Sequence, residues 1–496
     1  MALLKLLFKG VRLTQGLKVG VMGAALAIAP VLAAQAKICP AQLAGRLDAI
    51  TAQPILQKAR VGVLIETQGE TPTERQVLYA RDADQFFIPA SNAKLLTTAA
   101  ALDFLGPTYR IRTSVYATSQ SNGLTSLRVV GRGDPSLETE DLLALAQQVS
   151  QSGLRSVSQL VTDDSYFPGS IVNPNWEWED VQAGYGAPAN GLILNGNAIN
   201  LSLAPQAVGQ PLQVIWENSR QSNAWRIVNQ SRTVAPGEAE LVNVGRDLSQ
   251  PVLYVSGQLV AGSEAEAVAI AVPNPAQAFL DQFQQTLNNQ GISVAQTAID
   301  VDGLSQLPNE LAFHQSPPLS ELLMPTNRNS NNLYAEALLK TVGVTYFPQR
   351  PDQATEAGIK AVTNILVHLG LDANSFSLAD GSGLSRHNLV TPSALVELLQ
   401  IMATHPDANI YRESLAVAGV SGTLRNRLRN TVLNGQLYGK SGAVSGNVAL
   451  SGYVNVPNYR PLVVSILINN SDQRAGTLRQ VIDQMVLTLA EVQSCP

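Results

Sequence analysis

A serine and a lysine three positions apart are the first residues in this sequence whose spacing could support catalysis. Ser91 and Lys94 open the segment SNAKLLTTAAAL, residues 91–102, whose composition predicts a helix beginning at Ser91. Residues three apart lie on one face of a helix, so the lysine amine can reach the serine hydroxyl. The amine can deprotonate that hydroxyl only if burial or a neighbouring cation lowers its pKa. The pair is a candidate nucleophile and base, although taken alone the spacing is more typical of an N-cap serine beside a solvated lysine.

Two further polar motifs follow in an order that strengthens the catalytic interpretation. Ser330-Asn331-Asn332 falls in a polar loop before a helical pattern, and Lys440-Ser441-Gly442 falls on a strand-like segment. Each of them alone would be read as a turn or as the end of a strand. Enzymes with a Ser-x-x-Lys nucleophile carry Ser-Asp-Asn and Lys-Thr-Gly elements in the same order. The three motifs together predict one site with Ser91 as its nucleophile.

The elements that must position these motifs come from the two ends of the chain. Apolar alternation predicts strands at 61–65 and 76–80, ahead of the helix that carries Ser91. Near the other end, strands are predicted at 447–456 and 461–469, followed by a helix with apolar residues at spacings of three and four. We therefore expect a fold of the α/β (α+β) class, in which helices flank an antiparallel sheet.

The domain organisation follows from a change of pattern in the middle of the chain. Residues 37–110 and 300–496 are expected to form the catalytic domain. In residues 111–299, strand-like runs alternate with turns rich in Gly, Asn, Ser and Pro, and two stretches have helical spacing. We expect one or two inserted domains here, two being the preferred number, with mainly β structure.

With these motifs in place, the chain resembles the class C low-molecular-mass penicillin-binding proteins, which are D-alanyl-D-alanine carboxypeptidases and endopeptidases. The resemblance covers nearly the whole chain after residue 36 and includes the 239 positions between Ser91 and Ser330. It also includes four shorter signatures, Gly133-Asp134-Pro135, Tyr185-Gly186-Ala187-Pro188, Asp380-Gly381-Ser382-Gly383-Leu384-Ser385-Arg386 and Gly422-Thr423-Leu424. It implies a penicillin-binding/β-lactamase-like transpeptidase fold with inserted domains.

The resemblance implies a role for each catalytic residue. Ser91 would attack the carbonyl between two D-alanines, Lys94 would accept its proton, and Ser330 would relay a proton to the leaving amine. The substrates would be peptidoglycan stem peptides, and β-lactam antibiotics would be covalent inhibitors on Ser91. Neither a metal nor another cofactor would take part.

The same resemblance implies the residues that bind substrate. Asn332 would hold the substrate amide, and Lys440 with Ser441 would receive the terminal carboxylate. The backbone N–H groups of Ser91 and Ala443 would form the oxyanion hole.

Two positions in this part of the site leave questions open. Family members commonly carry Thr or Ser after the third motif, whereas this chain has Ala443 after Gly442. The missing hydroxyl leaves open whether carboxypeptidase or endopeptidase action dominates. Arg386 either helps to orient the substrate carboxylate or ties its loop to the domain.

Other functions fit parts of the sequence. A non-catalytic peptidoglycan-binding homologue is favoured only by Ala443. A serine β-lactamase would place the first two motifs much closer together. An esterase of the α/β-hydrolase type would need a Gly-x-Ser-x-Gly elbow, which is absent around Ser91.

The first 36 residues have the pattern of a signal peptide. Basic residues precede an apolar run from Val19 to Ala34, which closes with the small-residue site Ala34-Gln35-Ala36. The alternative is a retained membrane anchor, for which this run is short, since a spanning helix needs about 20 residues. Loss of the four basic residues would change the net charge from −5 to −9. We expect export to the periplasm, and peripheral association with the membrane stays open.

The composition argues against two classes of protein. Only 14% of the residues are charged and acidic residues exceed basic ones, whereas nucleic-acid binders normally show a basic excess. The four histidines and two cysteines have no metal-ligand spacing. Cys39 and Cys495 lie near the two ends of the mature chain and either pair in an oxidising compartment or remain free thiols.

Overall fold

The computed structural model describes residues 37–495 apart from 120–124, 219–221, 223–224, 304–308, 348 and 350. The predicted signal peptide, residues 1–36, lies outside the described residues. None of the helices within the described part combines the length and the apolar character that crossing a bilayer requires.

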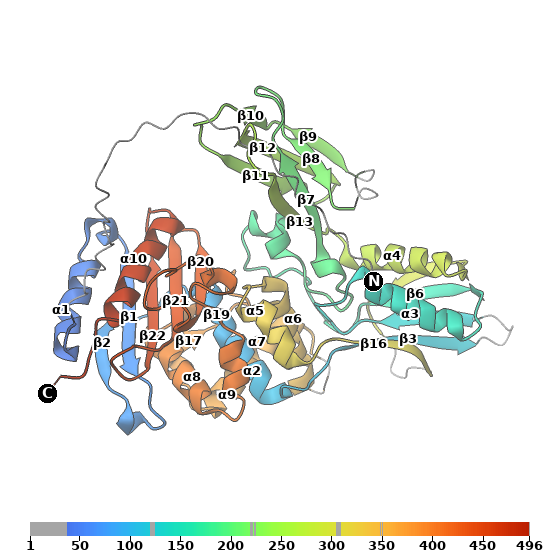
Figure 1. The fold of residues 1–496 in the computed structure, drawn as a ribbon. Coiled ribbons are helices and arrows are strands. Elements are labelled where there is room, and N and C mark those ends of the chain that lie inside the picture. Colours follow the sequence, from blue (N-terminus) through green and yellow to red (C-terminus); the bar gives the residue numbers. More distant parts are fainter. Residues whose placement is uncertain are drawn as a thin grey trace, which may run out of the picture. The chain divides into compact units, whose positions relative to one another are not determined.

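A six-stranded antiparallel sheet joins the two ends of the chain, as the apolar patterns predicted (Figure 1). Its strand order is β19-β20-β21-β22-β1-β2. The N-terminal strand β1 pairs with β22, with Val63 opposite Ile466. The bounds are β1 Arg60–Thr67, β2 Val77–Arg81, β19 Ala416–Val417, β20 Leu437–Val444, β21 Asn447–Val454 and β22 Leu462–Asn469.

Both faces of this sheet are buried. Side chains alternate along each strand, so each strand contributes residues to two cores, one on each face. On β1, Val61, Val63 and Ile65 share one apolar core with α1 (Pro40–Thr51) and α10 (Ala475–Leu489). Leu64 points the other way, into the core of a helical layer. A sheet covered on both faces gives the site a rigid support.

The two cysteines form a disulfide. Cys39 is the residue before α1, and Cys495 lies close to the end of the chain, after α10. Their Cα atoms are 5.6 Å apart. The pairing that the sequence left open is present, and it ties the two ends of the chain together.

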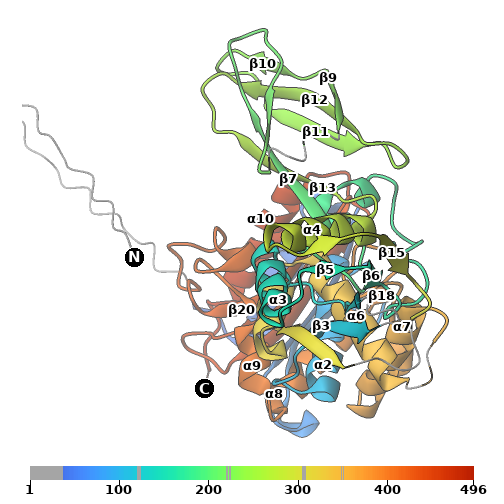
Figure 2. The ribbon, with the colours of Figure 1, turned by 90° about the vertical axis from the view of Figure 1, so that its right-hand side faces the viewer.

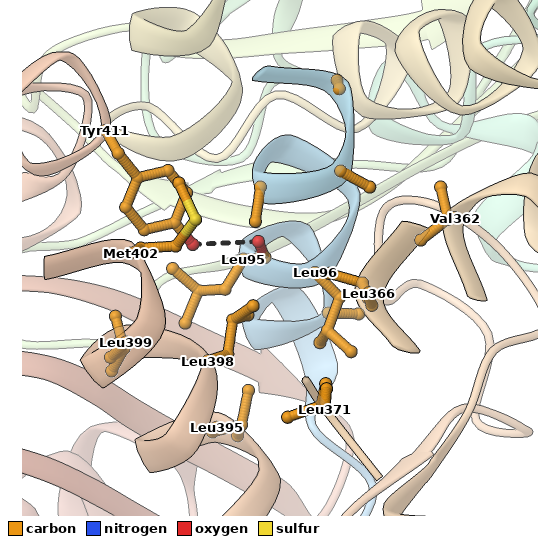
Figure 3. Close-up of a cluster of buried hydrophobic side chains, with 14 of the residues drawn as sticks. Leu95, Leu96, Val362, Leu366, Leu371, Leu395, Leu398, Leu399, Met402 and Tyr411 are labelled. Atoms are coloured by element: carbon orange, nitrogen blue, oxygen red, sulfur yellow. Dashed lines mark hydrogen bonds between the residues drawn. The ribbon is translucent and has the colours of Figure 1, made fainter. Parts of the chain in front are cut away.

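The helical layer surrounds α2 (Ala93–Leu105), which is apolar on almost all sides and therefore suited to a core position. Figure 3 shows Leu95 and Leu96 packed among leucines of the neighbouring helices, and the Tyr411 hydroxyl donates to the carbonyl oxygen of Leu95 at 2.9 Å. The neighbouring helices are α5 (Leu319–Asn327), α6 (Asn332–Tyr346), α7 (Ala354–His368), α8 (Pro392–Thr404) and α9 (Ala408–Glu413).

The start of α2 differs slightly from the prediction. A 3₁₀ turn at Ala90–Asn92 precedes the helix, so Ser91 lies in this turn and Asn92 is the N-cap residue. The Asn92 side chain makes no capping hydrogen bond, because α2 continues the turn without an extended residue between them. Composition predicts where a helix lies more reliably than it predicts the first residue.

Residues between α2 and α5 form sheets that are separate from the six-stranded one (Figures 1 and 2). A five-stranded mixed sheet has the order β15-β6-β4-β3-β16 and shares an apolar core with α3 (Thr139–Gln151) and α4 (Pro275–Asn289). Its strands are β3 Arg112–Ser119, β4 Thr125–Val130, β6 Gln159–Asp163, β15 Thr297–Asp300 and β16 Glu310–Gln315, with the short pair β5 Ser156–Val157 and β14 Ser293–Val294 nearby.

Seven more strands form two smaller sheets with a core of their own. They are β7 Ala198–Ala204, β8 Gln213–Trp216, β9 Arg226–Asn229, β10 Arg232–Val234, β11 Leu241–Arg246, β12 Val252–Val260 and β13 Glu266–Ala271. The division of residues 111–299 into two inserted domains stays a prediction.

Candidate active site

The first two motifs line one cleft of about 270 Å³, and the third lies beside it, where Lys440 contacts Ser330. Ser91 comes from the turn before α2, Ser330 and Asn332 from the start of α6, and Ala443 from β20. The other lining residues are Asp180, Tyr185, Gly383, Leu384, Arg386, Val444 and Ser445. Segments hundreds of positions apart in sequence thus contribute to a single site.

Lys94 lies at the base of this site with three hydrogen-bond partners. Its Nζ is 3.1 Å from Ser91 Oγ, 2.6 Å from Asn332 Oδ1 and 2.6 Å from the carbonyl oxygen of Ser382. The side chain is fully buried. Burial lowers the pKa of Lys94 to about 7, against the opposing effect of the Asp380 and Glu336 carboxylates. A large fraction of this amine is therefore neutral at neutral pH and able to accept a proton.

A second buried lysine serves the other serine. Lys440 Nζ donates to Ser330 Oγ at 2.8 Å and to the carbonyl oxygen of Ser441 at 2.8 Å. Burial lowers the pKa of Lys440 well below its ordinary value, and the charge of Lys94 lowers it further. The site holds two amine–hydroxyl pairs, Lys94 with Ser91 and Lys440 with Ser330.

Glycine allows β20 to lie directly against the turn that carries the nucleophile. A Cβ atom on Gly442 would stand 2.8 Å from the backbone nitrogen of Ser91 and 2.8 Å from the carbonyl oxygen of Pro89. No side chain fits in this gap without a shift of the backbone. The third motif thus needs its glycine for a close approach of two backbones.

Two residues of the site hold a left-handed backbone that non-glycine residues rarely adopt. Ala90, next to the nucleophile, has φ 47°, and Ser330 has φ 62°. Such conformations cost about 1–3 kcal/mol and persist only where the surrounding structure holds them. The packing of α2, α6 and β20 supplies this restraint at Ala90 and Ser330.

Comparison with models of protein families shows to which family the chain belongs. The model of the D-Ala-D-Ala carboxypeptidase 3 (S13) family matches residues 43–492. The chain belongs to the S13 family. It is therefore a serine peptidase, and its predicted place among the class C low-molecular-mass penicillin-binding proteins is confirmed.

Individual relatives agree with the S13 assignment. The chain is 35% identical over 488 residues to a D-alanyl-D-alanine carboxypeptidase of Actinomadura sp. (strain R39), covering 94% of this chain and 88% of that one. It is 28% identical over 456 residues to the penicillin-sensitive carboxypeptidase A of Dictyostelium discoideum, covering 87% of each. The crystal structure of penicillin binding protein 4 (dacB) from Haemophilus influenzae superimposes with a TM-score of 0.77 at 25% identity, over 89% of this chain and 98% of that one. The predicted fold class is confirmed.

Within this S13 site, Arg386 is engaged by two carboxylates. Its Nε lies 2.9 Å from Glu177 Oε1 and its Nη1 lies 3.2 Å from Asp180 Oδ2. These contacts tie the loop of Arg386 to the segment between α2 and α5, yet Arg386 also lines the cleft. Carboxylate binding by Arg386 stays a prediction.

Ser441 also has a partner that sequence analysis did not propose. Its hydroxyl donates to Thr423 Oγ1 at 2.7 Å, so Thr423 of the Gly-Thr-Leu signature places a second hydroxyl beside the third motif.

Sequence analysis missed the buried carboxylates behind Lys94. Glu336 and Asp380 are almost fully inaccessible, and burial, followed by the charge of Asp380, raises the pKa of Glu336 to about 7. A signal for Glu336 was available, because it stands four positions after Asn332 within the apolar run of α6. A charged residue among apolar neighbours of a core helix requires a buried partner.

Proposed function

We propose that the chain is a serine-type D-alanyl-D-alanine carboxypeptidase and endopeptidase that cleaves peptidoglycan stem peptides through an acyl-enzyme on Ser91. The single observation that carries this proposal is the contact of a fully buried lysine amine with the Ser91 hydroxyl at 3.1 Å. A neutral amine so placed can remove the hydroxyl proton without histidine.

Acylation would proceed in balanced steps. Ser91 Oγ bonds to the carbonyl carbon between two D-alanines while its proton passes to Lys94 Nζ. The negative charge formed on the carbonyl oxygen is stabilised by the backbone N–H groups of Ser91 and Ala443. The C–N bond then breaks as the leaving amine takes the proton of the Ser330 hydroxyl. The protonated Lys440 amine, which donates to Ser330 Oγ at 2.8 Å, gives that oxygen a proton in return.

Substrate would be held by groups in and beside the cleft. Asn332 would bind the substrate amide while its own Nδ2 remains anchored to the carbonyl oxygen of Tyr185 at 2.9 Å. The terminal carboxylate of a carboxypeptidase substrate would favour the protonated form of Lys440, and that cation would bind it together with the hydroxyl of Ser441. A β-lactam, whose amide carbonyl is equally open to attack, would acylate Ser91 and inhibit the enzyme.

We further infer that the enzyme works in the periplasm after removal of residues 1–36. The disulfide between Cys39 and Cys495 supports this inference, because such bonds persist in oxidising compartments.

Labelling with fluorescent penicillin tests the proposal. Wild type should be labelled and should release D-alanine from a stem pentapeptide, and Ser91→Ala should do neither. Equal labelling of both proteins would refute the assignment of the nucleophile. Labelling of the wild type without release of D-alanine would favour the non-catalytic binding homologue instead.

A further inference from the structure

The turn at Gly381 and Ser382 is held from two sides. Its N–H groups donate to Glu336 Oε1, at 3.0 Å from Gly381 and 2.8 Å from Ser382. Its carbonyl oxygens face α2, where Gly381 accepts from Thr97 Oγ1 at 2.8 Å and Ser382 accepts from Lys94 Nζ at 2.6 Å. Glu336 therefore fixes the turn whose oxygen contacts the catalytic lysine.

This turn influences the direction of the lysine lone pair. A neutral amine has two N–H groups and one lone pair, and Lys94 Nζ has three neighbours. The Asn332 Oδ1 and the Ser382 carbonyl oxygen, each at 2.6 Å, can only accept hydrogen bonds. They take the two N–H groups, so the lone pair faces the remaining neighbour, the Ser91 hydroxyl at 3.1 Å.

The same side chain also contributes negative charge in its ionised form, which predominates above its pKa of about 7. The charges of Asp380 and Glu336 both act on Lys94, and the charge of Lys94 acts on Lys440 of β20. Glu336 is itself subject to the charges of Asp380 and Lys340. Asp380 is held by four neutral donors, the backbone N–H groups of Gly383 and Ser385 and the side chains of Asn388 and Trp176. Asp380 has the larger electrostatic effect on Lys94 and binds N–H groups later in the loop. Glu336 differs because it acts on Lys94 electrostatically and also accepts from the N–H groups of Gly381 and Ser382 themselves.

We propose that Glu336, which lies outside the three motifs, is a positioning residue for Lys94. Through the turn at 381–382 it aims the lysine lone pair at Ser91, and through its negative charge it sets how tightly the lysine holds a proton. The inference rests on the proposed function, in which Lys94 is the base for acylation of Ser91.

Glu336→Gln tests the charge. The glutamine keeps the size of the side chain and an oxygen that can accept from both N–H groups, but it carries no charge. Lys94 then holds its proton less tightly, so the rise of the benzylpenicillin acylation rate with pH moves to lower pH by about half a unit or more. A folded Glu336→Gln protein whose pH profile matches wild type would overturn this part of the proposal.

Glu336→Asp tests the positioning. Aspartate keeps the charge but is one methylene shorter, so its oxygen no longer reaches both N–H groups. The acylation rate on the pH plateau should fall about tenfold or more, because small misplacements of a catalytic group are costly. Acylation by Glu336→Asp at the wild-type rate would overturn the positioning role.

Thr341→Val is the matched control. Thr341 is buried on the same helix, its Oγ1 has no hydrogen-bond partner among the described residues, and valine has nearly the same shape. This variant should change neither the plateau rate nor the pH profile. An equal loss in Thr341→Val would mean that any change in α6 disturbs the site, and would overturn the specific role of Glu336.

The proposed function and the role of Glu336 can be rejected separately. If Ser91→Ala is still acylated, the proposed function is wrong. If Ser91→Ala is inert while the Glu336→Gln and Glu336→Asp proteins react as wild type does, the function stands and the role of Glu336 is rejected.

Discussion

At the scale of single residues, the site depends on lysines that the fold withdraws from water. Lys94 and Lys440 are both fully buried, and burial is the largest cause of their lowered pKa values. The Ser91 hydroxyl, which Lys94 contacts, is otherwise a weak nucleophile. Desolvation thus allows the Lys94 amine to act as a base toward Ser91.

The pH dependence of acylation follows from the pKa of Lys94. The amine acts only when it is neutral, and its pKa is about 7. The rate of acylation by benzylpenicillin should therefore rise about tenfold per pH unit well below pH 7 and level off above it. Rapid-quench measurements between pH 5 and 9 check this profile. A rate that decreases from pH 6 to pH 8 would contradict it.

Lys94→Arg separates charge from basicity at the same position. Arginine stays protonated in proteins, so it keeps the positive charge but cannot accept the Ser91 proton. Acylation should fall by about 10²–10⁴-fold at every pH. Recovery of fast acylation at high pH in this variant would show that another group is the base.

The short-range part of the site could be predicted from sequence, and the long-range part could not. Ser91 and Lys94 share a helix face whatever the rest of the chain does. The contact of Glu336 with the turn at Gly381 and Ser382 depends on how α6 packs against that turn, and no local pattern encodes this packing.

At the scale of elements, the site is the meeting point of α2, α6 and β20. β20 can approach the turn of Ser91 only because residue 442 has no side chain. The strands themselves were predictable from alternation. Their order was not, because the pairing of β1 with β22 joins segments nearly 400 positions apart through contacts that sequence periodicity does not specify.

Gly442→Ala should damage the site more than the fold. The new Cβ atom would stand 2.8 Å from the Ser91 nitrogen and 2.9 Å from Ala90 Cβ, so β20 and the turn must separate. Acylation should fall about 10²-fold, since that separation moves the oxyanion donors. Gly45→Ala is the matched control, because a Cβ atom there has no neighbour within 4 Å and lies on helix α1. Gly45→Ala should leave acylation unchanged. If Gly442→Ala were acylated at the wild-type rate, the site would not depend on the close approach of β20 to the turn of Ser91.

At the scale of the whole molecule, the catalytic sheet is closed by the two ends of the chain. β1 comes before the segments between α2 and α5, and β20, β21 and β22 come after them. The Cys39–Cys495 disulfide adds a covalent link to this arrangement across 456 positions of sequence. Sequence analysis located both cysteines but could not place their Cα atoms, because that distance is a property of the finished fold.

Loss of the disulfide should lower the stability of the folded protein and leave its acylation rate unchanged. Replacing both Cys39 and Cys495 by serine should destabilise the protein by about 2–4 kcal/mol, since the link restricts the unfolded chain. The melting temperature should fall, whereas acylation at 25 °C should be unchanged because α1 and α10 cover the face of the sheet opposite to α2. An unaltered melting temperature with slower acylation would contradict this view.

The most direct test of the account is the position of the covalent bond formed with a β-lactam. After brief exposure to benzylpenicillin, peptide mass spectrometry of the wild-type protein should find one penicilloyl group, on the oxygen of Ser91. A penicilloyl group on Ser330, or the absence of a penicilloyl group from every serine of the cleft, would contradict the assignment of Ser91 as the nucleophile.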